Sequence, residues 1–183
     1  MATIIDNDFQ PQSASVWPTA LKYGLYIGAI SIVLQLLSDL LGFNAYSPDA
    51  GFVDKALGWL GTIIGIVLLV QAVKHVRDSL QGGRITFGKA FGTAMATSLI
   101  AVLIAAVWTY VYFAFINGDA LEEIKELSLQ NAQFDEDAEG ADTALSFMDA
   151  AFSPGGFAVS ALFGGLIIYA IIDLIIAAVM KKD

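Results

Sequence analysis

The sequence predicts an all-α membrane protein with four transmembrane helices and a short helical extracytoplasmic insertion between the third and the fourth. Of its 183 residues, 57% are hydrophobic and 15% are charged, whereas a soluble domain is usually about 45–50% apolar and about 25% charged. The apolar residues gather in four runs, each long enough to cross about 30 Å of hydrocarbon as a helix. These runs are continuous rather than alternating, which favours helices over the strands of a barrel. We expect residues 1–183 to form a single integral membrane domain.

The four expected spans differ in length and cover residues 21–43, 57–73, 90–116 and 157–180. Ahead of the first span, the N-terminus carries the acidic residues Asp6 and Asp8, and no short apolar core leads to a small-residue cleavage site. It lacks the pattern of a signal peptide, so we expect the first span to be retained. The second span is short, and the third is long enough to be tilted or to extend past the bilayer.

Positive charges predict the orientation, because Lys and Arg in short loops accumulate on the cytoplasmic side. Seven of the nine basic residues lie in the hinge between the second and third spans, at the start of the first span or in the C-terminal tail: Lys22, Lys74, Arg77, Arg84, Lys89, Lys181 and Lys182. Only Lys55 and Lys125 lie on the other side. The hinge and both termini are therefore expected in the cytoplasm, and an even number of spans is consistent with that placement.

The segment 117–155 is expected to form an acidic cap on the outer side. It holds ten of the eighteen acidic residues and one basic residue. Two stretches within it, "GDALEEIKELSLQNA" and "TALSFMDAAF", place apolar residues at helical spacing, which predicts two short amphipathic helices. The sequence "SPGG" then breaks the chain before the fourth span.

The acidic turn of this segment, "DEDAEGADTALS", partly matches a calcium-binding EF-hand loop. Asp135, Asp137 and Glu139 stand at ligand positions 1, 3 and 5, and Gly140 stands at position 6. Position 12 is Ser146, which cannot supply the bidentate carboxylate that closes such a loop. We therefore expect a solvated acidic turn and no metal site.

The hinge has a specific pattern of a basic helix end, a Gly-Gly turn and then "ITFGKAFGTAM". Together with "YGLYIGAISIVL" in the first span, "SPGGF" before the fourth and "DLIIAAVMKKD" at the end, it resembles an uncharacterised bacterial membrane family, catalogued as domain of unknown function 4199. The resemblance covers nearly the whole chain from about Val16. It implies four helices, a charged outer insertion and a bacterial inner membrane, but no activity, cofactor or catalytic residue.

Each span carries small residues four positions apart, a spacing that lets helix backbones approach closely in membranes. The pairs are Gly24 and Gly28, Gly61 and Gly65, Gly88 and Gly92, and Ser160 and Gly164. They predict helix contacts, either within one chain or between the chains of a homo-oligomer. The alternative is that membrane helices are rich in glycine without any such role.

Three polar residues within the spans are candidates for function: Asp173, Gln35 and Asp39. An ionisable group inside a span is costly and marks an ion, proton or substrate pathway by default. For Asp173 the sequence nevertheless favours a structural pairing with Lys22, Lys74 or His75, or a water-reached crevice, because no relay of further acids is visible. We expect Asp39 near the outer interface, and Gln35, one turn away on the same face, to hydrogen-bond another helix.

The inventory of reactive groups argues against an enzyme, since there is one histidine, no cysteine and no recognisable catalytic motif. The net charge of −9 argues against nucleic acid as a partner. The leading hypothesis is thus a non-enzymatic membrane protein that scaffolds or binds a protein partner through its acidic cap. The alternative is a small transporter or channel subunit that uses Asp173; a membrane-embedded enzyme is a weaker third.

Overall fold

The computed structural model describes residues 15–43, 51–131 and 141–182, and within these ranges the chain is built of helices. They are α1 (Trp17–Leu40), α2 (Phe52–His75), α3 (Phe87–Val111), α4 (Asp119–Asn131), α5 (Ala141–Ala151) and α6 (Pro154–Met180). Two π-helical turns, η1 (Val76–Leu80) and η2 (Tyr112–Ile116), extend α2 and α3. Four helices are long and apolar enough to cross a membrane: Trp17–Leu40, Lys55–Leu80, Phe87–Ile116 and Pro154–Met180. The predicted all-α fold with four such helices is confirmed.

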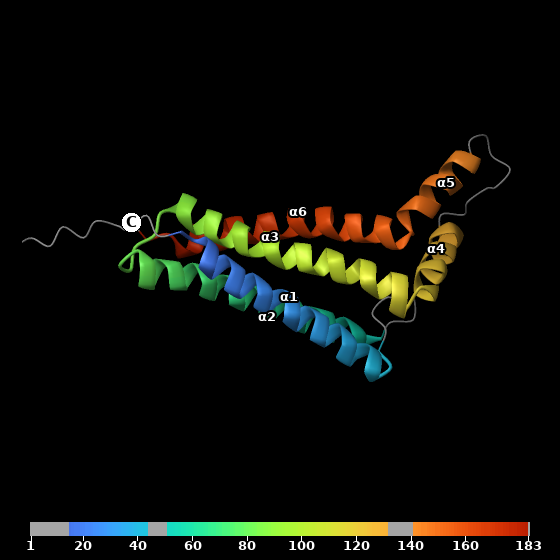
Figure 1. Ribbon diagram of the computed structural model, residues 1–183, viewed down its shortest axis with the longest axis horizontal. Helices are drawn as coiled ribbons and strands as arrows, with labels where there is room; N and C mark the ends of the chain where they lie inside the picture. The colour runs from blue at the N-terminus through green and yellow to red at the C-terminus, as the bar shows by residue number, and fades with distance from the viewer. Residues whose placement is uncertain (1–14, 44–50, 132–140, 183) are drawn as a thin grey trace, which may run out of the picture.

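The long helices α1, α2, α3 and α6 run side by side with alternating direction (Figure 1). The start of α1, the turn between η1 and α3, and the end of α6 lie together at what we call the hinge end. The short helices α4 and α5 lie at the opposite end, the cap end. Helix α3 is central, because it packs against α1, α2 and α6.

All four long helices begin before the spans that hydropathy predicts, and α1 ends three residues before its span does, because capping and backbone hydrogen bonds rather than apolar runs set the helix ends. Helix α6 begins three residues early, at Pro154, where Ser153 accepts a hydrogen bond of 3.0 Å from the Gly156 N–H. A serine cap followed by proline is a favoured helix start. At the end of the expected second span, the helix continues past Val73 through Lys74 and Arg77, whose long side chains can reach a polar interface.

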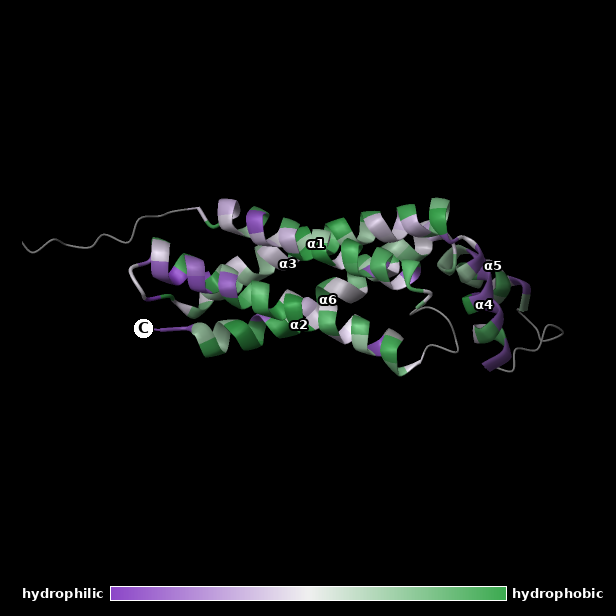
Figure 2. Cartoon of the chain, turned by 90° about the horizontal axis from the view of Figure 1, so that it is seen from below, coloured by the Kyte–Doolittle hydropathy of each residue, from purple (hydrophilic) through white to green (hydrophobic). Residues whose placement is uncertain are grey.

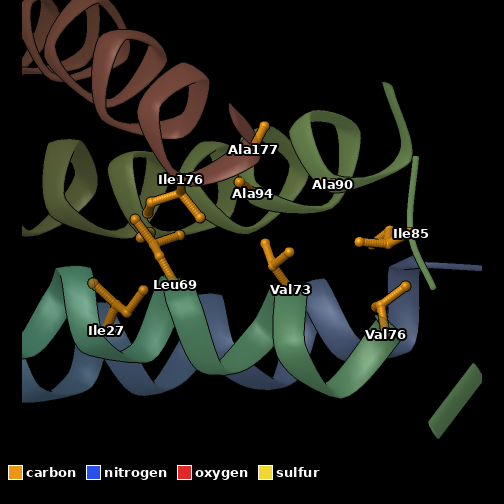
Figure 3. Close-up of a cluster of buried hydrophobic side chains, with 10 residues drawn as sticks. Ile27, Leu69, Val73, Val76, Ile85, Ala90, Ala94, Ile176 and Ala177 are labelled. Atoms are coloured by element: carbon orange, nitrogen blue, oxygen red, sulfur yellow. The ribbon is translucent and has the colours of Figure 1, made fainter. Parts of the chain in front are cut away.

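Apolar side chains from all four long helices meet near the hinge end (Figure 3). Ile27 of α1, Leu69 and Val73 of α2 and Ile176 of α6 are buried against one another, with alanines of α3 beside them. The C-terminal tail is fixed to the same region, because Ile85 and Lys182 exchange two backbone hydrogen bonds of 3.0 Å.

The outer surface of the long helices is apolar along most of their length, whereas polar residues gather at the hinge end and on α4 (Figure 2). Trp59, Ile167 and Val179 are 69%, 65% and 76% exposed. Exposed apolar surface of this extent promotes aggregation in water, whereas it is normal for a helix that faces lipid. The surface thus agrees with four membrane-spanning helices.

The two short helices predicted in the cap correspond to α4 and α5. Ala120 and Leu121 of α4 are buried against Tyr112 and Phe113 of η2, which attaches α4 to the end of α3. Lys125 of α4 and Asp149 of α5 form an ion pair that joins the two helices. Of the acidic turn, Asp135, Asp137, Glu139 and Gly140 lie outside the described residues, so the expectation of no calcium site stays a prediction.

Candidate functional site: buried carboxylates and a polar column

Asp173 is fully buried between α6 and α3, and only one of its two carboxylate oxygens is hydrogen-bonded. The Ser98 hydroxyl donates to Asp173 Oδ1 over 3.0 Å, whereas Oδ2 has no hydrogen-bond partner. The expected pairing of Asp173 with a nearby cation is wrong: within the described part of the chain, the two ion pairs are Arg77 with Asp78 and Lys125 with Asp149. The sequence did not predict the role of Ser98, because a contact between residues 75 positions apart leaves no local pattern in the sequence.

Helix α3 accommodates this carboxylate through a row of small hydroxyl residues. Thr93, Thr97 and Ser98 are all fully buried. The Thr93 and Thr97 hydroxyls donate to the carbonyl oxygens of Lys89 and Thr93, one turn earlier, at 2.7 and 2.8 Å. Such bonds within the helix satisfy a hydroxyl without a partner on another helix. Ser98 differs from these threonines in that its hydroxyl is directed to Asp173.

Tyr169 lies one helical turn before Asp173 and therefore on the same face of α6. A methyl group placed on Gly65 of α2 would lie 3.3 Å from the Tyr169 hydroxyl, which shows that the hydroxyl rests directly on the α2 backbone. The same tyrosine lines a cavity of about 230 Å³ between α1, α2 and α6. The polar residues of this cavity are Ser31, Gln35, Ser38, Thr62 and Tyr169.

A second polar cluster stands at the cap end, around Tyr112 of η2. Asn117 Nδ2 donates to the Tyr112 hydroxyl over 2.9 Å, and the side chains of Asp39 and Gln35 lie within hydrogen-bonding reach of that hydroxyl. Asp39 Oδ2 is buried without a partner. Asp39 lies one residue before the end of α1, and part of its carboxylate is enclosed; its expected place near the outer interface stays a prediction. Asp39, Tyr112 and Asn117 line a cavity of about 280 Å³.

Gln35 connects the two clusters, because it lines the cavity beside Tyr169 and also reaches Tyr112. At about 1.5 Å per residue, Asp173 lies about 10 Å from the hinge-end terminus of α6, whereas Asp39 precedes the cap-end terminus of α1 by one residue. Polar groups therefore recur from one carboxylate to the other along the interior of the helices. We call this series (Asp173, Ser98, Tyr169, Gln35, Tyr112 and Asp39) the polar column.

Some of the predicted glycine pairs contact another helix, and others do not. A methyl group on Gly24 or Gly28 of α1 would lie 2.7 Å from side-chain atoms of Ile100 or Ile104 of α3. Gly61 and Gly65 are approached less closely, at 3.4 and 3.3 Å. Gly88, Gly92 and Gly164 face open space in the single chain, so a role for them between chains stays a prediction. Gly165, which the spacing did not single out, would meet Val102 at 3.1 Å.

The arrangement of the column can be related to known proteins only at the level of the family. No curated protein and no solved structure matches the chain. The family described as "Protein of unknown function (DUF4199)" matches residues 22–182, which include every member of the polar column. The chain belongs to this family.

Proposed function

We propose that this chain is a non-enzymatic membrane protein that moves a proton or a small cation, with Asp173 as the binding group. The observation that carries the proposal is that Asp173 is fully buried in a membrane-spanning helix with one carboxylate oxygen unpaired. A charged side chain at the centre of a span costs at least about 2.5–3.5 kcal/mol on insertion scales. Its charge therefore needs balancing, and no basic side chain among the described residues does so. A mobile cation or a proton bound at Asp173 would balance this charge.

The polar column supports transport over the scaffold hypothesis that the sequence favours. Four apolar spans make a poor pore when their few polar residues are scattered. Here, however, helices η2, α1 and α6 bring Tyr112, Gln35 and Tyr169 into one series with Asp173. A single chain thus places polar groups in series from Asp39, near its cap end, to Asp173, about 10 Å from the hinge-end terminus of α6, without requiring an oligomer. Intramembrane ionisable residues that face the interior of a helical assembly commonly mark such routes.

Flux measurements on the purified protein test this function. We expect proteoliposomes to take up protons or sodium ions faster than empty liposomes when a potassium diffusion potential, negative inside, is imposed. A pH-sensitive dye and a sodium-sensitive dye in parallel samples separate the two cations. If the protein is shown to be incorporated and the uptake rates of both protons and sodium ions equal those of empty liposomes, the proposal is refuted.

Partner binding through the acidic cap is a second candidate, and one observation favours it. Helix α4 is anchored to η2 by Ala120 and Leu121, which leaves Glu122, Glu123 and Glu126 exposed. A fixed acidic surface attracts a basic partner and sets the orientation of docking. Absence of flux in the experiment above would return this candidate to the leading position.

We further propose a bacterial inner membrane as the location, with both termini and the hinge in the cytoplasm. Lys and Arg support this orientation, since Lys74 in the last turn of α2, Arg77 in η1 and Lys182 just after α6 belong to segments that meet at the hinge end. The chain has no cysteine, and Ser79 at the hinge end and Gln130 on α4 are exposed. We expect Gln130→Cys to react with an impermeant maleimide in intact cells, and Ser79→Cys to react only after lysis. The reverse pattern would invert the orientation.

A further inference from the structure

We infer that the transported species is the proton and that Asp39, held by Tyr112, is a second proton-carrying site at the cap end of the polar column. The inference rests on the proposed function and deepens it, because it names the substrate and a second residue. It starts from two carboxylates of the long helices, Asp173 and Asp39, which share an unusual feature. Each has one oxygen that is buried and has no hydrogen-bond partner.

The donor sets at the two carboxylates suit a proton better than a metal cation. Calcium takes six to eight oxygen ligands and magnesium takes six. Asp173 has a single hydroxyl partner, Ser98, and Asp39 has the hydroxyl of Tyr112. In the described ranges, no three acidic, histidine or cysteine side chains come together in a possible metal site. A proton needs only one oxygen.

The groups between the two carboxylates can carry a proton without net chemical change. Tyrosine hydroxyls both donate and accept, and the titratable side chains that face the carboxylates are Tyr112 at Asp39 and Tyr169 near Asp173. A hydroxyl that receives a proton on its oxygen can release its own to the next acceptor and ends unchanged. The cavity of about 230 Å³ between Gln35 and Tyr169 has both polar and apolar walls and has room for several water molecules, which relay protons in the same way.

The balance over a full passage is one proton. A proton from water at the cap end binds the Asp39 carboxylate and neutralises it. The proton then passes through Tyr112 and the cavity to the Asp173 carboxylate. From Asp173 it is released at the hinge end. Both carboxylates return to their starting form, and no oxidant, reductant or co-substrate is consumed.

The local backbone at the cap end holds the Tyr112 hydroxyl beside Asp39. The π-helical turn η2 closes with a 2.9 Å hydrogen bond from the Asn117 N–H to the Tyr112 carbonyl oxygen. This bond brings the Asn117 side chain onto the Tyr112 hydroxyl, so the tyrosine receives from Asn117 and can donate to Asp39. The Tyr112 ring is buried against Phe113, at a centroid distance of 5.1 Å, and cannot swing away freely.

The test compares Asp39→Asn, Tyr112→Phe and the control Asp78→Asn in proteoliposomes under an imposed potential. Asp78 is an exposed carboxylate paired with Arg77 at the hinge end, outside the column. We expect Asp39→Asn to lower the proton flux about 100-fold, the lower end of the effect that a missing proton-transfer group has in catalysis. Tyr112→Phe should lower it as well, Asp39→Glu should restore part of it, and Asp78→Asn should leave it unchanged.

The outcomes separate this inference from the function on which it rests. Full proton flux in folded Asp39→Asn, with flux lost in Asp173→Asn, would overturn the role of Asp39 and keep the proposed function. Sodium uptake without any proton uptake would overturn the choice of the proton. Should Asp39→Asn fail to fold, Tyr112→Phe decides in its place, because it removes one hydroxyl and keeps the ring; full flux there would overturn the relay. No flux in the unchanged protein would overturn both.

Discussion

Replacement of Asp173 by Asn is expected to reduce proton flux in proteoliposomes to the level of empty liposomes while the protein remains folded. Asn keeps the size of Asp and one carbonyl oxygen, which can still accept the hydrogen bond that Ser98 donates over 3.0 Å. It cannot bind and release a proton in the range where a carboxylate does, so the passage stops at this position. The change removes the charge that burial penalises, and we therefore expect stability to be kept or raised.

The measurement is dye-reported proton uptake at equal incorporation, with size-exclusion profiles and thermal melts in detergent as the test of folding. Asp149→Asn in α5 is a matched control, because that carboxylate is exposed and paired with Lys125. Flux that persists in Asp173→Asn would show that Asp173 is only structural. An unfolded Asp173→Asn would be replaced by Asp173→Glu, which keeps a carboxylate and should retain flux.

Replacement of Gly24 and Gly28 together by alanine is expected to lower the melting temperature more than any other substitution of two predicted packing glycines. A methyl group on Gly24 would lie 2.7 Å from Ile100 Cβ and 2.9 Å from the Thr97 carbonyl oxygen, and one on Gly28 would lie 2.7 Å from Ile104 Cγ2. The side chains of isoleucine are stiff and a backbone oxygen cannot yield alone, so α1 must move away from α3. Overpacking of this kind costs about 1–3 kcal/mol at each site.

The pair Gly88→Ala with Gly92→Ala is the matched control, at the same spacing in α3 and with nothing within 4 Å. Without a clash, alanine in a helix is favoured over glycine by about 0.5–1 kcal/mol. The two double variants should therefore shift the melting temperature in opposite directions, by about 2–4 °C for each kcal/mol in a chain of this size. An equal fall in both would contradict close packing of α1 on α3 as the cause, and would point to contacts of α3 between chains.

The sequence predicted the four long helices correctly because continuous apolar runs leave little choice in a membrane. A backbone without water must satisfy its own hydrogen bonds, and a helix does so within one segment. Helix ends were predicted less well. The second span was expected to end at Val73, yet the helix reaches His75 and continues as η1 to Leu80, since hydrogen bonds along the backbone persist where hydropathy falls.

The candidate polar residues were recognisable one by one, because an acid or an amide in an apolar run is conspicuous. Asp173, Gln35 and Asp39 were all named from the sequence, and Gln35 with Asp39 was placed on one face by helical periodicity. Tyr112, Tyr169 and Ser98 were missed as members of a site, since tyrosine and serine are common in membrane helices. Spacing offered one usable signal, the four-residue step from Tyr169 to Asp173.

By itself, the sequence determined that this protein has four membrane-spanning helices, an acidic helical insertion and isolated polar residues within its spans. Only the tertiary structure decided that Ser98 rather than a lysine meets Asp173, and that Tyr112 meets Asp39. The physical reason is the separation along the sequence of the residues that make these contacts. Hydropathy and helical periodicity act between residues a few positions apart, whereas the Ser98–Asp173 contact joins residues 75 positions apart. Its existence depends on how α3 and α6 rotate and slide against each other, which close packing of small side chains fixes.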